Sequence, residues 1–286
     1  MPGITPEPLA VDSEAVRIVG DRWASETSSG TPIVLLHGGG QTRHSWDRSA
    51  AALAERGREV YTIDLRGHGD SSWAPDGDYG IDAFVNDIRN VVTSIGRAPI
   101  IVGASLGGIT GLCLAGENPG EAAALVMVDV VVHVEPEGIG RIQSFMTDHI
   151  DGFATLDEVA DAVTAYNPER KRPRNLEGLK KNVRLHDDGR WYWHWDPAFI
   201  TSSGNEARRH TDPARLSAAA QQVKVPTLIV RGGKSDVVSE AGVASMLELV
   251  PHADVADVSA AGHMVAGDDN QVFATAIDDF LDQHSL

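Results

Sequence analysis

Short apolar runs and longer amphipathic stretches alternate along the first half of the chain. Five runs are rich in β-branched residues and are bounded by turn residues: Pro32 to Leu36, Glu59 to Leu65, Pro99 to Ala104, Ala124 to Val130 and Pro226 to Val230. Runs of this kind are typical of strands buried on both faces, as in a parallel sheet covered by helices.

The stretches between the first four runs are long enough to form crossover helices. They are Ser45 to Arg56, Ile81 to Ile95 and Gly107 to Glu117. The opening stretch, Ala15 to Glu26, is expected to supply one or two antiparallel edge strands. This order predicts an α/β fold with a mostly parallel central sheet and helices on both of its faces.

The alternation stops in the middle of the chain. Residues 133–216 hold no comparable apolar run but several amphipathic stretches, such as Thr155 to Tyr166. We therefore expect one α/β core, formed by residues 1–132 and 217–286, that is interrupted by a helical cap insertion at 133–216.

The alternation returns after the insertion. The strand that begins at Pro226 is followed by a helix near Glu240 to Leu249, a short strand near Val255 to Val258, and a final helix from Asn270 to Leu281. With 286 residues, of which 42% are apolar, the chain has ample material for a large core.

The net charge and the cysteine content limit the kinds of binding partner and the cellular compartment that we expect. A formal net charge of -17 argues against nucleic acid and against an anionic membrane surface, because both repel an acidic chain at long range. Cys113 is the only cysteine, so no intramolecular disulfide is possible. No segment approaches the roughly 20 apolar residues that cross a bilayer. We expect a soluble, unprocessed, cytoplasmic protein with a small-molecule partner, and the sequence leaves its oligomeric state open.

The strongest local signal is Gly103-Ala104-Ser105-Leu106-Gly107, which follows an apolar run and opens a helical stretch. A serine on a sharp turn between strand and helix needs small neighbours, and Gly103 and Gly107 meet that need. The turn directs the hydroxyl away from the sheet. It also points the Leu106 amide, at a helix N-terminus, toward an incoming oxyanion.

A glycine loop, His37-Gly38-Gly39-Gly40, directly follows the first apolar run. Such a loop can bring a second backbone N–H close to the oxygen of a tetrahedral intermediate. Gly39 is the first choice for this donor, with Gly40 close behind. A phosphate loop is disfavoured because the Lys-Ser/Thr pair that it requires is absent.

Two later segments supply an acid and a base. Asp236 ends the loop Gly232-Gly233-Lys234-Ser235-Asp236 after the run at Pro226, where open α/β sheets place their ligand sites. His263 follows a glycine in Ala260-Ala261-Gly262-His263-Met264, after the last short strand. The order Ser, Asp, His differs from that of chymotrypsin and of subtilisin.

These residues give the chain a resemblance to the α/β-hydrolase superfamily, from Pro32 to Leu281. The loop Asp64-Leu65-Arg66-Gly67-His68-Gly69-Asp70-Ser71 strengthens it, because D-x-R-G-x-G-x-S is common in the esterase, epoxide hydrolase and haloalkane dehalogenase branches. The resemblance implies that the insertion is the family's cap. The loop itself is a turn whose Arg can pair with an Asp, a structural role, and His68 is not counted as catalytic.

The nucleophile separates the branches. Dehalogenases and epoxide hydrolases of the superfamily use a carboxylate at the position of Ser105, whereas serine calls for acyl transfer. His263 would accept the hydroxyl proton and return it to the leaving group, while Asp236 fixes the tautomer of the imidazole. Asp129, which ends the run at Ala124, is the alternative acid, because some members of the superfamily carry it there.

The predicted substrate pocket combines the glycine loop, the cap and the base loop. Trp191 and Trp193, in the cap sequence Trp191-Tyr192-Trp193-His194-Trp195, can wall an apolar acyl pocket or pack the cap onto the core. Gly40 and Met264 complete the expected substrate-binding set. The histidines show no zinc spacing, so no metal or redox cofactor is expected.

Four functions compete at this point. The leading one is hydrolysis of a carboxylic ester or lactone of a small to medium apolar substrate. The enzymatic alternatives are a C–C bond hydrolase of ring-fission diketones, from which the chain departs by carrying Met264 where many members carry Trp, and a cofactor-free haloperoxidase or perhydrolase. A ligand-binding protein on a hydrolase scaffold is the non-enzymatic alternative.

Overall fold

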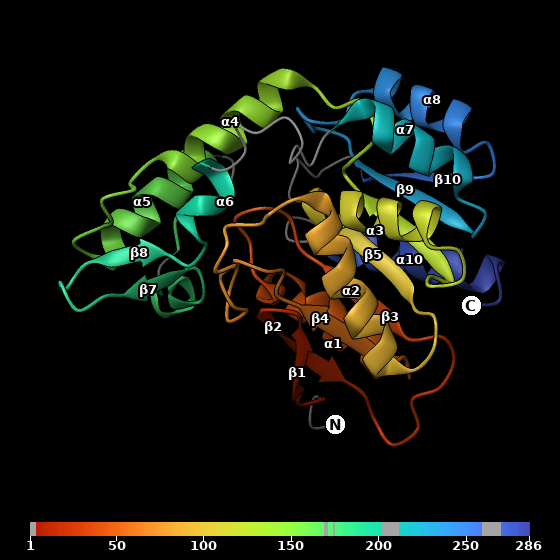
Figure 1. Cartoon of the computed structure of the whole chain (residues 1–286), viewed down its shortest axis with the longest axis horizontal. Helices are drawn as coiled ribbons and strands as arrows, with labels where there is room; N and C mark the ends of the chain where they lie inside the picture. The colour runs from red at the N-terminus through yellow and green to blue at the C-terminus, as the bar shows by residue number, and fades with distance from the viewer. Residues whose placement is uncertain (1–3, 169–170, 174, 202–211, 259–269) are drawn as a thin grey trace.

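A twisted eight-stranded sheet forms the centre of the computed structural model, which describes residues 4–168, 171–173, 175–201, 212–258 and 270–286. The strand order is β1-β2-β4-β3-β5-β6-β9-β10 (Figure 1). Its strands are β1 (Glu7–Ser13), β2 (Val16–Trp23), β3 (Ile33–Leu36), β4 (Val60–Ile63), β5 (Ile100–Ala104), β6 (Ala124–Val128), β9 (Thr227–Gly232) and β10 (Asp254–Val258).

All strand pairs from β4 to β10 are parallel, whereas β2 pairs antiparallel with both of its neighbours, β1 and β4. Successive residues of a central strand serve different faces of the sheet. In β3, Val34 and Leu36 join one buried cluster, whereas Ile33 and Leu35 join the other. This is why the central strands read as continuous apolar runs rather than as alternating ones.

Helices cover both faces of the sheet. One face packs on α1 and α10, and the other on α2, α3, α7 and α8. The bounds of these helices are α1 (Asp47–Glu55), α2 (Ile81–Ile95), α3 (Leu106–Glu117), α7 (Pro213–Gln222), α8 (Glu240–Leu249) and α10 (Asn270–Gln283), and the short 3-10 helix η1 (Arg43–Trp46) precedes α1. The predicted α/β fold with helices on both faces is confirmed.

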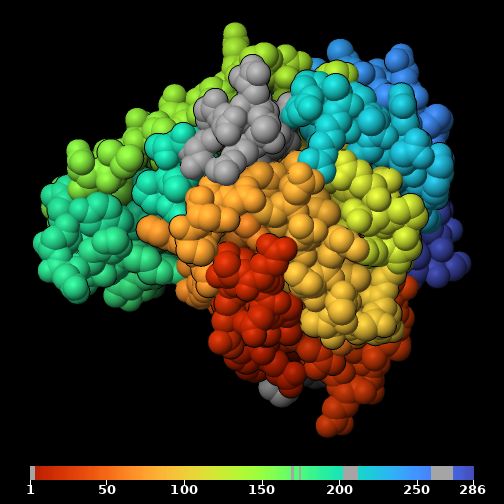
Figure 2. Space-filling view, in the orientation of Figure 1, coloured from red at the N-terminus to blue at the C-terminus, as the bar shows by residue number. Residues whose placement is uncertain are grey.

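A group of short elements lies between β6 and α7 in the chain and projects to one side of the core, at the left of Figures 1 and 2. We call residues 136–201 the cap lobe. Its elements are α4 (Pro136–Thr147), α5 (Leu156–Tyr166), the 3-10 helix η2 (Glu177–Lys181), β7 (Val183–Leu185), β8 (Trp191–Trp193) and α6 (Pro197–Thr201).

Three details differ from the sequence pattern. The edge strand β1 (Glu7–Ser13) begins before the stretch that was expected to hold it, because most of its side chains are exposed and give little apolar signal. The cap lobe contains an antiparallel pair, β7 and β8, whose strands of three residues are too short for a periodic signal. The expected boundary at residue 216 falls inside α7, so the domain division stays a prediction.

The order of the strands determines where a ligand site can form. The chain moves outward from β3 to β4 and then returns across β3 to β5, so the connections after β3 and β5 diverge between two neighbouring strands. Crevices of this kind, at the carboxyl ends of parallel strands, are the usual ligand sites of open α/β sheets. In the part of the chain that is described, no helix is long and apolar enough to cross a membrane.

The contact between α3 and α7 yields a prediction about stability. A Cβ on Gly116 in α3 would lie 2.1 Å from the carbonyl oxygen of Ala219 in α7, and a backbone atom cannot move aside without moving the helix. We expect Gly116→Ala to lower the free energy of unfolding by about 1–3 kcal/mol. Urea denaturation measures it.

Gly140→Ala is the matched control. Gly140 lies inside α4, and a Cβ there would meet nothing within 4 Å. This change should be neutral, or stabilising by up to about 1 kcal/mol through helix propensity. Equal effects of the two substitutions would show that the close helix contact does not limit residue 116.

Candidate active site

Ser105 lies on a strained turn between β5 and α3. Its backbone angles are φ 47° and ψ -114°, a region that residues other than glycine rarely occupy. The turn leaves no room for larger neighbours: a Cβ on Gly103 would lie 2.2 Å from the carbonyl oxygen of Gly107, and one on Gly107 would lie 2.5 Å from that of Leu36. The half-buried Ser105 lines a cavity, as expected of a nucleophile.

The glycine loop after β3 lies directly against this turn. Gln41 donates its N–H to the carbonyl of Gly38 (3.1 Å), which closes a β-turn, and Gly40 has a φ of 73°, which favours glycine. A Cβ on Gly38 would lie 3.3 Å from the Cβ of Ser105. Gly107 donates its N–H to the carbonyl of His37 (3.2 Å), so the loop is also tied to the start of α3.

Two backbone amides beside Ser105 remain available. Among hydrogen bonds between described residues, none is donated by the N–H of Gly39 or of Leu106, the first residue of α3. The N–H of Gly40, by contrast, is donated to Nε2 of His68 (3.1 Å). The two available amides are therefore those of the predicted oxyanion hole, and Gly40 shapes the turn instead of donating to a ligand.

A cavity of about 510 Å³ lies between this turn and the cap lobe. Its size is in the usual range of small-molecule sites. Its lining is partly apolar and partly polar. The apolar residues, which we call the apolar wall, are Ile142, Phe145, Met146, Val163, Tyr166, Trp193 and Trp195, and the polar residues include Gln41, His44, Arg48, Asn167, Lys181 and Asn182.

Of the predicted substrate-binding residues that the structure describes, two line the cavity and Trp191 does not. Trp193 and Gly40 line the cavity, and Trp193 stacks on Trp195 with ring centroids 4.8 Å apart. Trp191 is not among the described residues that line it, since its backbone pairs with Leu185 of β7 and bridges to Phe153. Residues His263 and Met264 lie outside the described residues.

Sequence reasoning missed part of the apolar wall. Ile142, Val163 and Tyr166 were not predicted to reach the site. They belong to α4 and α5, whose apolar positions follow helical periodicity. That periodicity identifies a buried face, but it does not tell whether the face meets the core or a cavity.

Asp236, the predicted acid, faces the cap lobe. Its Oδ2 forms an ion pair with Nη2 of Arg141 in α4 at a distance of 2.8 Å, and 36% of its side chain is exposed. It does not line the described part of the cavity wall. The strand that precedes it, β9, is two places away from β5 in the sheet.

Asp129, the alternative acid, is buried at the carboxyl end of β6, the strand next to β5. Its φ of 48° is in the left-handed region. Oδ1 accepts the N–H of Gly232 (2.9 Å) and Oδ2 accepts the hydroxyl of Ser235 (2.6 Å). Ser235 is itself oriented by the N–H groups of Val237 and Val238. The loop that carries Asp236 is thus built around the carboxylate of Asp129.

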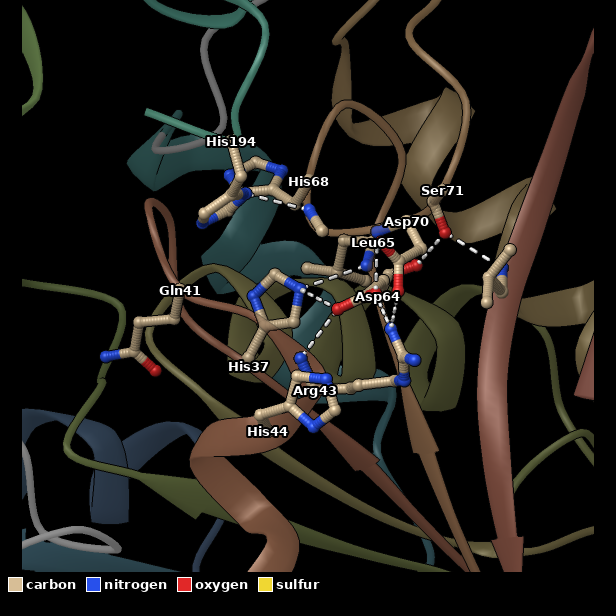
Figure 3. A network of polar contacts seen from close by, with 12 residues as sticks. His37, Gln41, Arg43, His44, Asp64, Leu65, His68, Asp70, Ser71 and His194 are labelled. Atoms are coloured by element: carbon tan, nitrogen blue, oxygen red, sulfur yellow. Dashed lines mark hydrogen bonds and ion pairs between the residues drawn. The ribbon is translucent and has the colours of Figure 1, made fainter. Parts of the chain in front are cut away.

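A buried polar network includes His37 and Arg43, which lie on either side of the glycine loop in the chain (Figure 3). Asp64 accepts the N–H of Arg43 and pairs with its guanidinium, and it also accepts the N–H of Asp70 (2.9 Å). His37 accepts the N–H of Leu65 at Nε2 (3.0 Å), and burial lowers the pKa of its imidazole to about 4. His37 is therefore neutral at physiological pH. Its buried hydrogen bond to Leu65 fixes the start of the glycine loop.

The D-x-R-G-x-G-x-S loop has the structural role expected of it. Arg66 pairs through Nε and Nη2 with both oxygens of Asp87 in α2, at 2.6 and 2.7 Å, and both side chains are buried.

Within the described ranges, no three His, Cys, Asp or Glu side chains lie close enough together to hold a metal ion.

Comparison with known proteins agrees with this geometry. The family model of the α/β-hydrolase fold matches residues 31–269, and the chain belongs to that family. An esterase of Mycobacterium tuberculosis is 30% identical over 287 residues, which cover 98% of this chain and 91% of the relative. An sn-1-specific diacylglycerol lipase of Mus musculus is 28% identical over 87% of this chain and 80% of its own.

Solved structures give the same result. The crystal structure of an esterase from Mycobacterium tuberculosis superposes with a TM-score of 0.75 at 27% identity, covering 98% of this chain and 92% of that one. An E-2-(acetamidomethylene)succinate hydrolase reaches a TM-score of 0.84 over 97% and 100% of the chains, and at 22% identity it supports the fold alone. With Ser105 at the elbow and relatives named esterase and lipase, the chain is a serine hydrolase of this family.

Cys113 gives a prediction that separates it from the nucleophile. It is fully buried in α3, and burial raises the pKa of its thiol to about 12. We expect no reaction with Ellman's reagent at pH 8 in the native protein, because the thiolate is the reacting form, and full reaction after unfolding in guanidinium. Rapid labelling of the native protein would contradict this burial.

Proposed function

We propose that the chain hydrolyses a carboxylic ester or lactone through an acyl-enzyme on Ser105. One observation carries the proposal: the strained Ser105 lines an apolar-walled cavity beside two backbone amides, of Gly39 and Leu106, that donate no hydrogen bond to a described residue. Such amides are suited to the oxygen that becomes negative when a serine attacks a carbonyl.

In the proposed reaction, Oγ of Ser105 bonds to the carbonyl carbon while His263 accepts its proton. The oxyanion is held by Gly39 and Leu106. The intermediate then collapses, the alcohol leaves with the proton from His263, and the acyl group stays on Ser105. Water, deprotonated by His263, attacks the acyl-enzyme and releases the carboxylic acid.

We assign the acid of the triad to Asp129 in preference to Asp236. Asp129 is adjacent to the nucleophile strand, and its two oxygens accept hydrogen bonds from Gly232 at the end of β9 and from Ser235 in the loop that follows. Asp236 is half-exposed and paired with Arg141. A buried, oriented carboxylate is what stabilises an imidazolium during catalysis, whereas an exposed carboxylate engaged with a guanidinium is not.

The cavity favours a small to medium acyl group. Aromatic side chains of the cap lobe and Met146 can hold an apolar chain, and the volume of about 510 Å³ limits its length. The relatives named esterase and lipase support this substrate class. C–C bond hydrolysis, perhydrolysis, simple ligand binding and a cytoplasmic location stay predictions of the sequence, and turnover of p-nitrophenyl esters against diketones or peroxide separates the first three.

The nucleophile is tested by Ser105→Ala. A fluorophosphonate probe should label the wild-type protein once and the variant not at all, because the probe phosphonylates an activated serine. Hydrolysis of p-nitrophenyl esters should fall by on the order of 10⁶-fold in kcat. Labelling of the variant at the wild-type rate would reject Ser105.

The acid is tested by a pair of isosteric changes. Asp129→Asn should lower kcat by on the order of 10⁴-fold, because the imidazole loses its charged partner and its tautomer is no longer fixed. Asp236→Asn should change kcat by less than about threefold, because its side-chain ion pair among the described residues is the one with Arg141, at the surface. Urea denaturation checks that both variants fold. The reverse pattern would return the role to Asp236.

A further inference from the structure

We propose that His68 and His194 are positioning residues that hold the backbone of the Gly39–Gly40 turn, and that through His194 the cap lobe is coupled to the oxyanion hole. The inference rests on the proposed function, since it concerns the donor that Gly39 supplies. Neither histidine lines the described part of the cavity wall, so both act through the turn and not on the substrate.

His68, from the loop after β4, holds the amide of Gly40. Its Nδ1 lies 3.0 Å from the carbonyl oxygen of Arg66, which only accepts, so the proton is on Nδ1. Its Nε2 is then the acceptor for the N–H of Gly40 at 3.1 Å. Only the neutral ring with this tautomer makes both bonds, and the ring is fully buried.

His194, from the cap lobe, lies on the carbonyl side of the same residue. Its Nδ1 accepts the N–H of Gly69 at 2.8 Å, so its proton is on Nε2, which lies 3.4 Å from the carbonyl oxygen of Gly40. The two histidines therefore carry opposite tautomers and contact opposite polar groups of one glycine. Figure 3 shows His68 and His194 close together above His37.

Both rings are buried, and they lie close to the buried ring of His37. Centroids of His37 and His68 are 5.2 Å apart, and those of His68 and His194 are 5.9 Å apart. Burial is the largest cause that holds the pKa of His194 well below its ordinary value, and the neighbouring imidazoles of His68 and His37 act in the same direction. We call His37, His68 and His194 the histidine row. The donor and acceptor nitrogens of His68 and His194 are set by the hydrogen bonds described above.

The residues that follow His194 fasten this segment to the core. Asp196 donates its N–H to the carbonyl of Gly67 (2.9 Å) and accepts the hydroxyl of Tyr79 (2.5 Å). The ring of Phe199 meets that of His68 edge-on, with centroids 4.8 Å apart. These contacts place the end of the cap lobe on the loop that holds the turn.

Alternate residues of this segment have different neighbours. Trp193 and Trp195 line the cavity, whereas His194 and Asp196 contact the core loop. One short stretch of the cap lobe thus forms the apolar wall and also holds the oxyanion turn.

His68 offers a matched pair of variants. In His68→Gln, the amide oxygen reaches the position of Nε2 and can still accept the N–H of Gly40. In His68→Asn, the shorter side chain reaches only the position of Nδ1 and leaves that N–H without its acceptor. We expect His68→Asn to lower kcat for p-nitrophenyl esters by about 10- to 100-fold with little change in KM, and His68→Gln to restore most of it.

His194 offers a second pair. In His194→Gln the amide nitrogen reaches the position of Nε2 and keeps the contact with the carbonyl of Gly40, whereas His194→Asn reaches only the position of Nδ1, so that it keeps the bond to Gly69 and loses the contact with the turn. His194→Asn should therefore lose more kcat than His194→Gln, about 10-fold by the same reasoning. His252→Asn, on the exposed surface near α8, controls for a general effect of removing a histidine.

A second readout reports on the oxyanion hole itself. The affinity of a boronic-acid transition-state analogue should fall in parallel with kcat/KM across the four variants, because the analogue needs the same donors. Unfolding midpoints identify any variant that fails to fold, and the His194 pair then carries the test alone.

The outcomes distinguish this inference from the proposed function. If the wild-type protein is not labelled by fluorophosphonate and cleaves no ester, the proposed function fails. If it is labelled and cleaves esters, but the Asn and Gln variants at each position have equal kcat, the proposed function stands and the positioning role is overturned. Loss of kcat that follows only the loss of stability overturns it as well.

Discussion

The close approach between the loop after β3 and the first turn of α3 is the constraint on which the site depends. Gly107 donates to the carbonyl of His37, and a side chain on Gly103 or Gly107 would overlap backbone atoms. At this contact the backbone of Ser105 adopts a positive φ of 47°. It also sets the glycine turn beside the hydroxyl, so one packing condition positions both the nucleophile and its oxyanion donors.

Strain occurs at the ends of two adjacent strands. Ser105 follows β5 and Asp129 follows β6, and both have a positive φ without being glycine. Each residue is held by its neighbour strand: Ser105 donates its N–H to Val128 (3.2 Å), and Asp129 donates its own to Val230 (2.7 Å). Strained residues persist where the surrounding structure fixes them, and the ladder of buried strands supplies that rigidity.

Sequence reasoning succeeded where a local rule applied and failed where tertiary geometry decided. The strands and the elbow followed from apolar runs and from glycines that no other residue can replace. The choice between Asp129 and Asp236 stays a prediction, because both follow a parallel strand, and the structure adds that their side-chain partners differ: Ser235 for Asp129 and Arg141 for Asp236. His194 was missed because its contact with Gly69 spans 125 positions of the chain.

Burial of the histidines bears on how the oxyanion donors are held. A neutral imidazole is required wherever its nitrogen must accept an N–H, and burial enforces neutrality at His37 and His194. The amides of Gly39 and Leu106 are the donors that the proposed function offers to a developing negative charge. In the proposed arrangement the cap lobe, which supplies His194, contributes to these donors by fixing the direction of the glycine turn.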